Sequence, residues 1–303
     1  AGRRSEQDQP RNVAVDLVGR QIGPEQPADE QPGEERHGEW LDRPVDDERH
    51  ADAAPVAADL AERGVSVAAI DYENPASLDA AFAGADTLVL VSSSEVGKRA
   101  TQHAAAIDAA SRAGVGRVIY TSAPAARTSA LILAPEHKAT EEYLEKSGLA
   151  HTVLRNGWYH ENYVGSAAQA AASGTLASSA GEGTVASASR ADYAEAAAVV
   201  ATTDGHEGAV YELSGDRAWN FAELAATISS IAGTPVSYAV LTPEEHHAAL
   251  TGAGLDEGTA GFVVALDGNI RDGLLGSTSG DLSRLIGRPT TPIETTLAGA
   301  LKG

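Results

Sequence analysis

The sequence predicts an α/β protein with a doubly wound parallel sheet and a small C-terminal substrate lobe. Short apolar strands alternate with helices from about residue 55 onward, which is the pattern of right-handed βαβ crossovers. The run TLVLV at residues 87–91 is apolar without interruption, as in parallel strands that are covered on both faces. The segment LRNGWYHENY at residues 154–163 directly follows a strand, and loops at the carboxyl ends of such strands bind ligands.

The composition narrows the classes of function. The 303 residues carry a net charge of −21, which argues against nucleic acid and membrane as partners because both require clustered Lys and Arg. The chain has no cysteine, so disulfides, thiolate nucleophiles and cysteine metal sites are excluded. No apolar run is long enough for a membrane span, and nothing resembles a signal peptide. We therefore expect a cytoplasmic enzyme or binding protein.

Residues 1–54 differ in composition from the rest of the chain. They are rich in acidic residues and arginine, lack lysine, and show almost no apolar periodicity outside Val13–Val18, which is typical of a strand. The chain also holds no methionine. We expect this segment to be disordered, or to be processed, truncated or altered at its start.

From residue 55 the pattern becomes regular. A helix over Ala57–Arg63 is closed by a glycine, and Val65–Asp71 (VSVAAID) is predicted as a strand. Asn74 and Pro75 are typical of a helix start. The sequence Ser92–Glu95 fits a capping box, from which a helix is expected to run to Gly114. Strands are also predicted at residues 117–121 and 150–154, with a helix over 135–148 between them.

The elements after residue 160 are sparser. Helices are predicted over residues 190–203 and 220–231, with strands at 209–213 and 236–240. The sequence Thr242–Glu245 forms a second capping box, and residues 254–303 are expected to hold short helices and loops. We predict three parts: an atypical segment over 1–54, a dinucleotide-binding core over 55–160, and the remaining sheet elements with the substrate lobe over 161–303.

Several segments of the chain resemble one known family. They read DYENPASLDAAFAGADTLVLVSSSEVGKR, GVGRVIYTSA, EHKATEEYLEKSGLAHTVLRNGWYHENY, ASASRADYAEAAA and VYELSGDRAWNFAELA. Together they are similar to the NmrA-like, atypical short-chain dehydrogenases, and above all to their type 2 NAD(P)H:quinone oxidoreductase branch. The resemblance runs from about residue 56 to the end, and SSSEVGKR followed by NGWYHENY is its most specific signature.

The resemblance implies a Rossmann fold and an enzyme without flavin or metal, which passes a hydride from NADPH to a small-molecule quinone. NAD is the alternative cofactor, and a homodimer is allowed. The implied catalytic residues are Asn156, Tyr159 and His137, the last of which matches a recurring histidine of the family. The implied cofactor-binding residues lie in the matched motifs and are Ser92, Ser93, Ser94, Glu95, Thr121, Ser122, Asn156, Gly157, Trp158, Tyr159 and Arg190.

The glycine-rich phosphate loop of this family is missing from its expected place. Such loops let the backbone approach the pyrophosphate at a helix N-terminus. The corresponding residues are Glu25–Gln31 (EQPADEQ), whose carboxylates would repel a pyrophosphate, and the nearest substitute is Gly19 with Gly23. Asp52 stands where an arginine for the 2′-phosphate is expected, which favours NAD. We hypothesise that a shifted reading frame produced residues 1–54; resequencing the coding DNA would test this.

Each candidate residue also has a structural interpretation. The serines can act only as a helix cap, Asn156 with Gly157 as a turn, and the two neighbouring aromatic residues as core. His246 and His247 do not form H-E-x-x-H, so no metal is expected there. The Tyr-x-x-x-Lys pair of short-chain dehydrogenases is absent. Two alternatives to the reductase therefore stay open: a dinucleotide-sensing regulator without turnover, and an inactive chain whose first βαβ unit is disrupted unless Val13–Val18 replaces the first strand.

Overall fold

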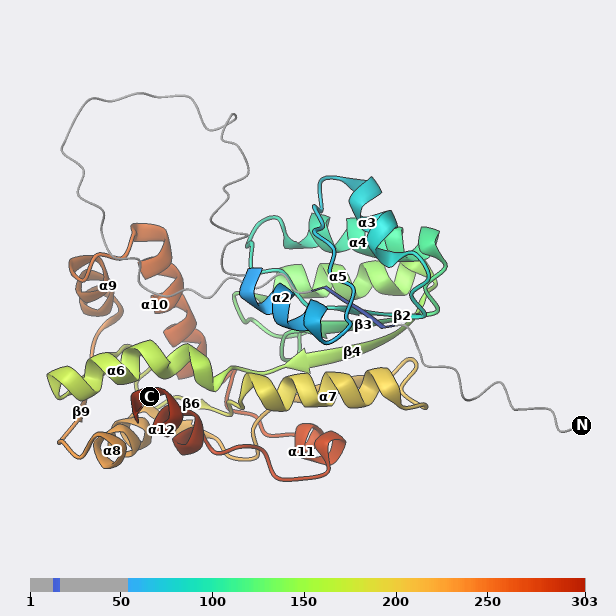
Figure 1. Cartoon of the computed structure of the whole chain (residues 1–303). Helices are drawn as coiled ribbons and strands as arrows, with labels where there is room; N and C mark the ends of the chain where they lie inside the picture. Colours follow the sequence, from blue (N-terminus) through green and yellow to red (C-terminus); the bar gives the residue numbers. More distant parts are fainter. Residues whose placement is uncertain (1–12, 17–53, 303) are drawn as a thin grey trace, which may run out of the picture.

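The computed structural model describes residues 13–16 and 54–302 and shows a layered α/β core joined to a smaller lobe (Figure 1). The core holds a five-stranded parallel sheet in the order β1-β2-β3-β4-β7. The strands are β1 (Val13–Asp16), β2 (Thr87–Leu90), β3 (Arg117–Ser122), β4 (Ala150–Asn156) and β7 (Val210–Leu213). The predicted doubly wound α/β fold is confirmed.

Helices cover both faces of the sheet, which explains why every residue of β2 and β3 is buried. One face carries α3 (Pro75–Phe82), α4 (Arg99–Ala113) and α5 (Ala134–Ser147), and the other carries α7 (Arg190–Thr202) and α11 (Asp281–Ile286) (Figure 1). Each face has its own apolar cluster. The first contains Leu78, Ile107 and Leu144, and the second contains Ile119 and Tyr193.

Local signals set most of the helix boundaries, as predicted. The Asn74 side chain accepts a hydrogen bond from the backbone of Ala76, and Pro75 begins α3. Gly114 and Gly148 end α4 and α5 in the left-handed conformation, which glycine adopts without strain. The helix α2 (Ala54–Glu62) precedes the regular part of the core.

Two of the predicted elements are wrong. The segment Val65–Asp71 forms no strand, because no strand in the described part of the chain pairs with it. Val65 and Val67 are about half exposed. The capping box at Ser92–Glu95 does not begin a helix, because the Ser93 backbone amide and hydroxyl bond to side chains of α4. The helix starts at Arg99 instead.

The predicted strand at Val13–Val18 is confirmed as β1, which lies parallel to β2 with Val13 opposite Thr87. It occupies the place beside β2 that the missing first strand would take. The predictions for Gly19, Gly23, Glu25–Gln31 and Asp52 concern residues outside those that the structure describes. No helix in the described part is long and apolar enough to cross a membrane.

The smaller lobe lies beyond the carboxyl end of β4 (Figure 1). Its parallel pair β5–β9 and antiparallel pair β6–β8 pack with five α-helices and a 3₁₀-helix in the described chain, around Trp219 and Phe221. These elements are η2 (His160–Tyr163), α6 (Val164–Ser173), β5 (Thr175–Ser178), β6 (Thr184–Val185), β8 (Trp219–Asn220), α8 (Phe221–Ala232), β9 (Ser237–Val240), α9 (Pro243–Gly252), α10 (Glu257–Arg271) and α12 (Ile293–Lys302). The capping box at Thr242 is confirmed, whereas α10 is longer than the short helices predicted there.

Candidate active site

The carboxyl ends of β2, β3 and β4 bring three predicted site residues to one edge of the sheet. Thr121 lies near the end of β3, Asn156 is the last residue of β4, and Ser92 follows β2 by two residues. The Ser92 backbone N–H donates to Thr121 Oγ1 at 2.8 Å. Because the strands are parallel, their polar ends converge where the smaller lobe begins, which is where ligands bind in such sheets.

The other residues of the loop after β2 differ in exposure. Ser93 is buried, Glu95 is half-buried, and Ser94 is exposed. The Glu95 carboxylate accepts a hydrogen bond from Gln102 Nε2 at 3.0 Å and lies 3.6 Å from Lys98 Nζ. The loop thus presents Ser92 and Ser94 at the sheet edge, while Ser93 faces α4.

Asn156 carries a buried polar atom that has no partner. The residue is 8 % exposed, and its Oδ1 forms no hydrogen bond with the described part of the protein. Buried polar atoms are nearly always paired, so an unpaired acceptor at a ligand-binding edge suggests a donor that comes from a ligand. The next residue, Gly157, allows close packing: a Cβ there would lie 3.0 Å from both the Tyr193 hydroxyl and the Leu213 carbonyl oxygen.

Trp158 and Tyr159 are both half-buried at this edge. Trp158 packs against the core of the smaller lobe. The Tyr159 ring meets the Tyr193 ring edge-on, with 5.2 Å between centroids, and the Arg190 guanidinium carbon lies 5.4 Å from the Tyr159 centroid. Burial raises the pKa of the Tyr159 hydroxyl. This hydroxyl therefore stays protonated at neutral pH and can donate a hydrogen bond.

Arg190 begins α7 and is tied to the NGWYHENY segment. Its backbone N–H donates to the Glu161 carboxylate at 3.0 and 3.1 Å, and its Nη2 donates to Asn162 Oδ1 at 3.4 Å. The aromatic segment and the start of α7 thus form one unit. Glu161 was not among the predicted residues, because it lies 29 residues before the helix start that it contacts and the sequence does not show this contact.

Ser122 and His137 are placed apart from this group. The Ser122 hydroxyl donates to the buried Glu141 carboxylate at 2.7 Å, and Arg155 holds the same carboxylate. His137 is 4 % exposed, with its Nδ1 2.7 Å from the Tyr120 hydroxyl. Burial, followed by the charge of Arg99, lowers the pKa of His137 to about 3, so this histidine is neutral. The side-chain hydrogen bonds of both residues lead away from Asn156 and Tyr159, although the Ser122 backbone lies opposite Arg155, the neighbour of Asn156, in the sheet.

The sequence does not predict a group of buried and half-buried side chains beside the loop after β2. It consists of Arg99 and His103 on α4 and Glu136 on α5. A signal for His103 exists, since it precedes Ala106, Ile107 and Ala110 at helical spacing on the buried face of α4. Nothing in the sequence says, however, which loop such a histidine contacts.

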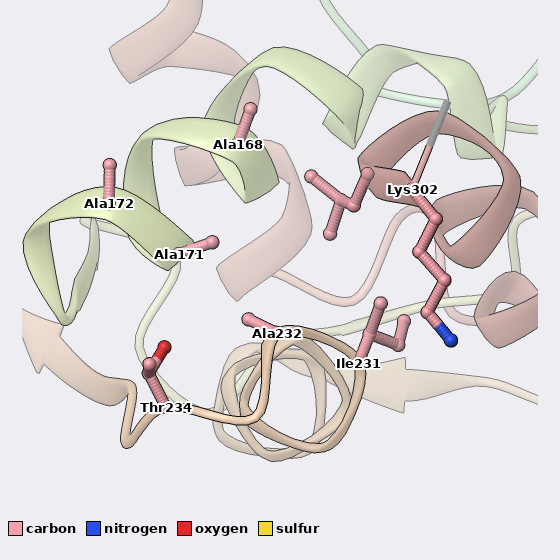
Figure 2. Close-up of a pocket in the computed structure, with 8 residues that line it drawn as sticks. Ala168, Ala171, Ala172, Ile231, Ala232, Thr234 and Lys302 are labelled. Carbon is pink, nitrogen blue, oxygen red and sulfur yellow. The ribbon is translucent and has the colours of Figure 1, made fainter.

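A separate apolar groove lies between α6, α8 and α12 (Figure 2). Its walls are mainly alanine and aliphatic side chains, with Thr234 and Lys302 at the rim. None of the predicted site residues line it. Elsewhere in the described chain, no three His, Asp or Glu side chains are grouped so that they could hold a metal ion.

The chain is similar to proteins of known structure and activity. It is 46 % identical over 234 residues to "Quinone oxidoreductase 2" of Escherichia coli K12, which covers 77 % of this chain and 82 % of that protein. A solved structure of an NADPH-dependent quinone oxidoreductase from E. coli, complexed with NADPH, superposes with a TM-score of 0.78 at 46 % identity, covering 82 % of this chain and 87 % of that one.

More distant similarity extends to the transcriptional regulator NmrA in complex with NAD. That structure gives a TM-score of 0.58 at 16 % identity, covering 82 % of this chain and 84 % of that one, and shows a shared fold alone. A family described as NAD(P)H-binding matches residues 49–204, about half of the chain. The chain therefore belongs to this NAD(P)H-binding family.

Proposed function

We propose that this chain is an NADPH-dependent quinone reductase that works without flavin. The observation that carries the proposal is the sheet edge where the unpaired Asn156 Oδ1 lies beside Trp158 and Tyr159. Half-buried aromatic side chains beside a buried amide suit two flat, polar-edged rings, the nicotinamide and the quinone. The 46 % identity to a quinone oxidoreductase supports the same activity.

The residues at this edge fit a dinucleotide. Ser92, Ser94 and Thr121 offer hydroxyl groups at the ends of β2 and β3, where the adenosine and ribose side would lie. The unpaired Asn156 oxygen can accept a hydrogen bond from the nicotinamide carboxamide. Arg190, half-buried over the Tyr159 ring, offers a positive charge to a phosphate. The residues at the expected place of the pyrophosphate loop, Glu25–Gln31, lie outside the described part.

When bound, NADPH supplies a hydride for the reduction. The protein's task is then to align the acceptor and to stabilise the negative charge that develops on its oxygen. The protonated Tyr159 hydroxyl can donate a hydrogen bond to that oxygen, and the amide of Asn156 can do the same through its nitrogen. Packing of Trp158 against the smaller lobe limits water at this edge. A quinone is electron-poor, so the absent Tyr-x-x-x-Lys pair is not required.

The test is the loss of NADPH absorbance with a small benzoquinone and no added flavin. We expect turnover by the wild-type chain and a fall in kcat on the order of 10²-fold for the combined Asn156→Ala, Tyr159→Phe variant. Tyr143→Phe is the matched control, because Tyr143 lies on the surface of α5 and bonds only to Asp108 in the described chain. Unchanged activity in the combined variant would remove both residues from the mechanism.

The same assay separates the reductase from a dinucleotide-sensing regulator. Tight NADPH binding without turnover of several quinones would favour the regulator, whose solved representative shares only the fold. Parallel titrations with NADH would measure the preference between the two cofactors. The homodimer, the cytoplasmic location, the absence of nucleic-acid and membrane partners, and the division at residue 160 stay predictions.

A further inference from the structure

Ser93 lies in the loop after β2, and each of its polar groups forms a hydrogen bond. Its backbone N–H donates to His103 Nε2 at 3.0 Å, its carbonyl oxygen accepts from Arg99 Nε at 2.6 Å, and its hydroxyl donates to Gln102 Oε1 at 2.5 Å. These three partners lie in the first two turns of α4. The start of the helix therefore fixes the course of the loop that precedes it.

The hydrogen bond from Ser93 requires one particular form of His103. Because Nε2 accepts a hydrogen bond from the Ser93 amide, the ring must be neutral and must carry its own proton on Nδ1. That nitrogen lies 3.0 Å from Thr140 Oγ1, whose hydroxyl donates onward to the Glu136 carbonyl oxygen at 3.0 Å. Because the Thr140 oxygen can accept a hydrogen bond from Nδ1–H, Thr140 favours the tautomer of His103 that is protonated on Nδ1.

Burial keeps His103 in this neutral form. The residue is 0 % exposed, and burial together with the charge of Arg99 lowers its pKa to about 3. The charged and titratable groups around it are Arg99, Tyr120, Glu136 and His137. The Glu136 carboxylate accepts from Arg99 Nη1 and from the Gly97 backbone, and the Tyr120 ring packs edge-on against His103. The loop is thereby fastened from α4 and α5 together.

We propose that neutral His103 is a positioning residue for cofactor binding, which holds Ser93 so that Ser92 and Ser94 face the nucleotide. This inference rests on the proposed function, since it assigns the loop to NADPH. His103 touches no reacting atom. Its loss should therefore weaken NADPH binding while leaving the chemical step at saturating cofactor largely intact.

The test compares His103→Phe with His103→Gln in the full-length chain. The phenylalanine fills the space but leaves the Ser93 amide without an acceptor, so we expect the dissociation constant and the KM for NADPH to rise about tenfold, with kcat changing less than about threefold. The glutamine carbonyl can accept from Ser93, and we expect it to restore most of the affinity. Direct titration of NADPH fluorescence measures binding without relying on turnover.

The control is Leu144→Ala. It truncates a buried side chain of α5 in the apolar cluster that also contains Leu78 and Ile107, and Leu144 makes no hydrogen bond to the loop after β2. It should lower the melting temperature and leave the NADPH dissociation constant unchanged. If His103→Phe and Leu144→Ala affect binding equally, or if kcat falls with unchanged KM, the positioning role is wrong. If His103→Phe does not fold, Thr140→Val takes its place, because it removes the partner that selects the tautomer; unchanged affinity in that variant would overturn the proposal.

The two proposals fail in different ways. A wild-type chain that binds NADPH but turns over no quinone would contradict the reductase, while the binding comparison at His103 would still decide the positioning role. A wild-type reductase with normal NADPH affinity in both His103 variants would contradict the positioning role alone.

Discussion

Two buried polar atoms without partners show how differently single residues are used. In the described part of the chain these are Asn156 Oδ1 and Tyr163 Oη. Asn156 lies at the sheet edge, where a ligand can pair its oxygen. The Tyr163 ring packs edge-on against Trp219, with centroids 4.8 Å apart, inside the apolar core of the smaller lobe. The first atom points to function, whereas the second is a cost to stability.

The substitution Tyr163→Phe should therefore leave the protein as stable as the wild type or make it more stable, by up to about 1 kcal/mol. It removes an unpaired hydroxyl and keeps the ring contacts. Urea unfolding of the variant and the wild type measures the difference. A loss of more than about 1 kcal/mol would mean that the hydroxyl has a partner in solution.

The buried histidines predict how stability depends on pH. Burial first, and then Arg99, lowers the pKa of both His103 and His137 to about 3. A group with a lowered folded pKa takes up its proton more readily in the unfolded chain, so stability falls as the pH drops below about 6.5. Between pH 7 and pH 5 we expect a loss on the order of 1–2 kcal/mol per histidine.

Urea titrations at these two pH values measure that loss. The variant His137→Gln should show a smaller difference between pH 7 and pH 5, because one of the two groups is gone. The variant Leu144→Ala is less stable but keeps both histidines. Its free energy of unfolding should therefore differ between pH 7 and pH 5 by the same amount as in the wild type. An unchanged pH dependence in His137→Gln would contradict a lowered pKa at this position.

At the scale of elements, the sequence predicts those strands and helices whose signals are local. Asn74 with Pro75, and the glycines after α4 and α5, mark helix ends whatever surrounds them. The prediction of a strand at Val65–Asp71 failed because alternating apolar residues form a strand only when a neighbouring strand pairs with them. The capping-box prediction at Ser92–Glu95 failed because side chains of α4, six to ten residues further along the chain, bond Ser93 instead.

The candidate site was predictable to a similar degree. The strand ends placed Ser92, Thr121 and Asn156 at one edge, because parallel strands end together. The sequence could not show that Ser122 bonds to Glu141 or that His137 bonds to Tyr120. Neighbouring strand residues point to opposite faces, so the contacts of Ser122 depend on which face carries which helix.

Close packing between loops gives a prediction for two glycines. A Cβ on Gly215, in the loop after β7, would fall on the carbonyl oxygen of Ser187, whereas one on Gly261, inside α10, would meet open space. Gly215→Ala should therefore lower the free energy of unfolding by about 3 kcal/mol or more. Gly261→Ala should raise it by roughly 0.5–1 kcal/mol, because alanine has the higher helix propensity. Thermal unfolding of the two variants checks this; equal midpoints would contradict the tight loop packing.

The buried ion pair between β4 and α5 is a second element-scale contact. Glu141 is 1 % exposed and accepts two hydrogen bonds from Arg155, at 2.9 and 2.7 Å. Burial raises the pKa of the Glu141 carboxyl, but the Arg155 and Ser122 hydrogen bonds outweigh it and hold the pKa below its usual range. Glu141→Gln removes the negative charge from this network, while Arg155 keeps a hydrogen bond to Glu212 at 2.8 Å, and the substitution should cost about 1.5–3 kcal/mol.

Its control is the exposed pair between Arg112 and Asp79, in which two guanidinium nitrogens donate to one carboxylate oxygen. Because water screens exposed charges, Asp79→Asn should hardly move the unfolding midpoint in urea. If both substitutions shifted the unfolding midpoint by the same small amount, the buried network would contribute no more to stability than the exposed pair.

At the scale of the whole molecule, cofactor binding should be visible as a change in stability. A ligand that binds only the folded chain stabilises it by about 2.7 kcal/mol at 100 times its dissociation constant. We therefore expect saturating NADPH to raise the melting temperature by roughly 5 °C. A melting temperature that does not move at millimolar NADPH would support the inactive chain, whose first βαβ unit lacks the phosphate loop.

The path of the chain between core and smaller lobe limits how the protein can move. After β4 the chain enters the smaller lobe, returns for α7 and β7, leaves again for α8 to α10, and returns for α11 before ending in α12. The Ile132 backbone adds a hydrogen bond to Asn269 on α10. A hinge would have to bend all of these crossings at once. We therefore expect that neither part folds when the two are expressed as separate pieces.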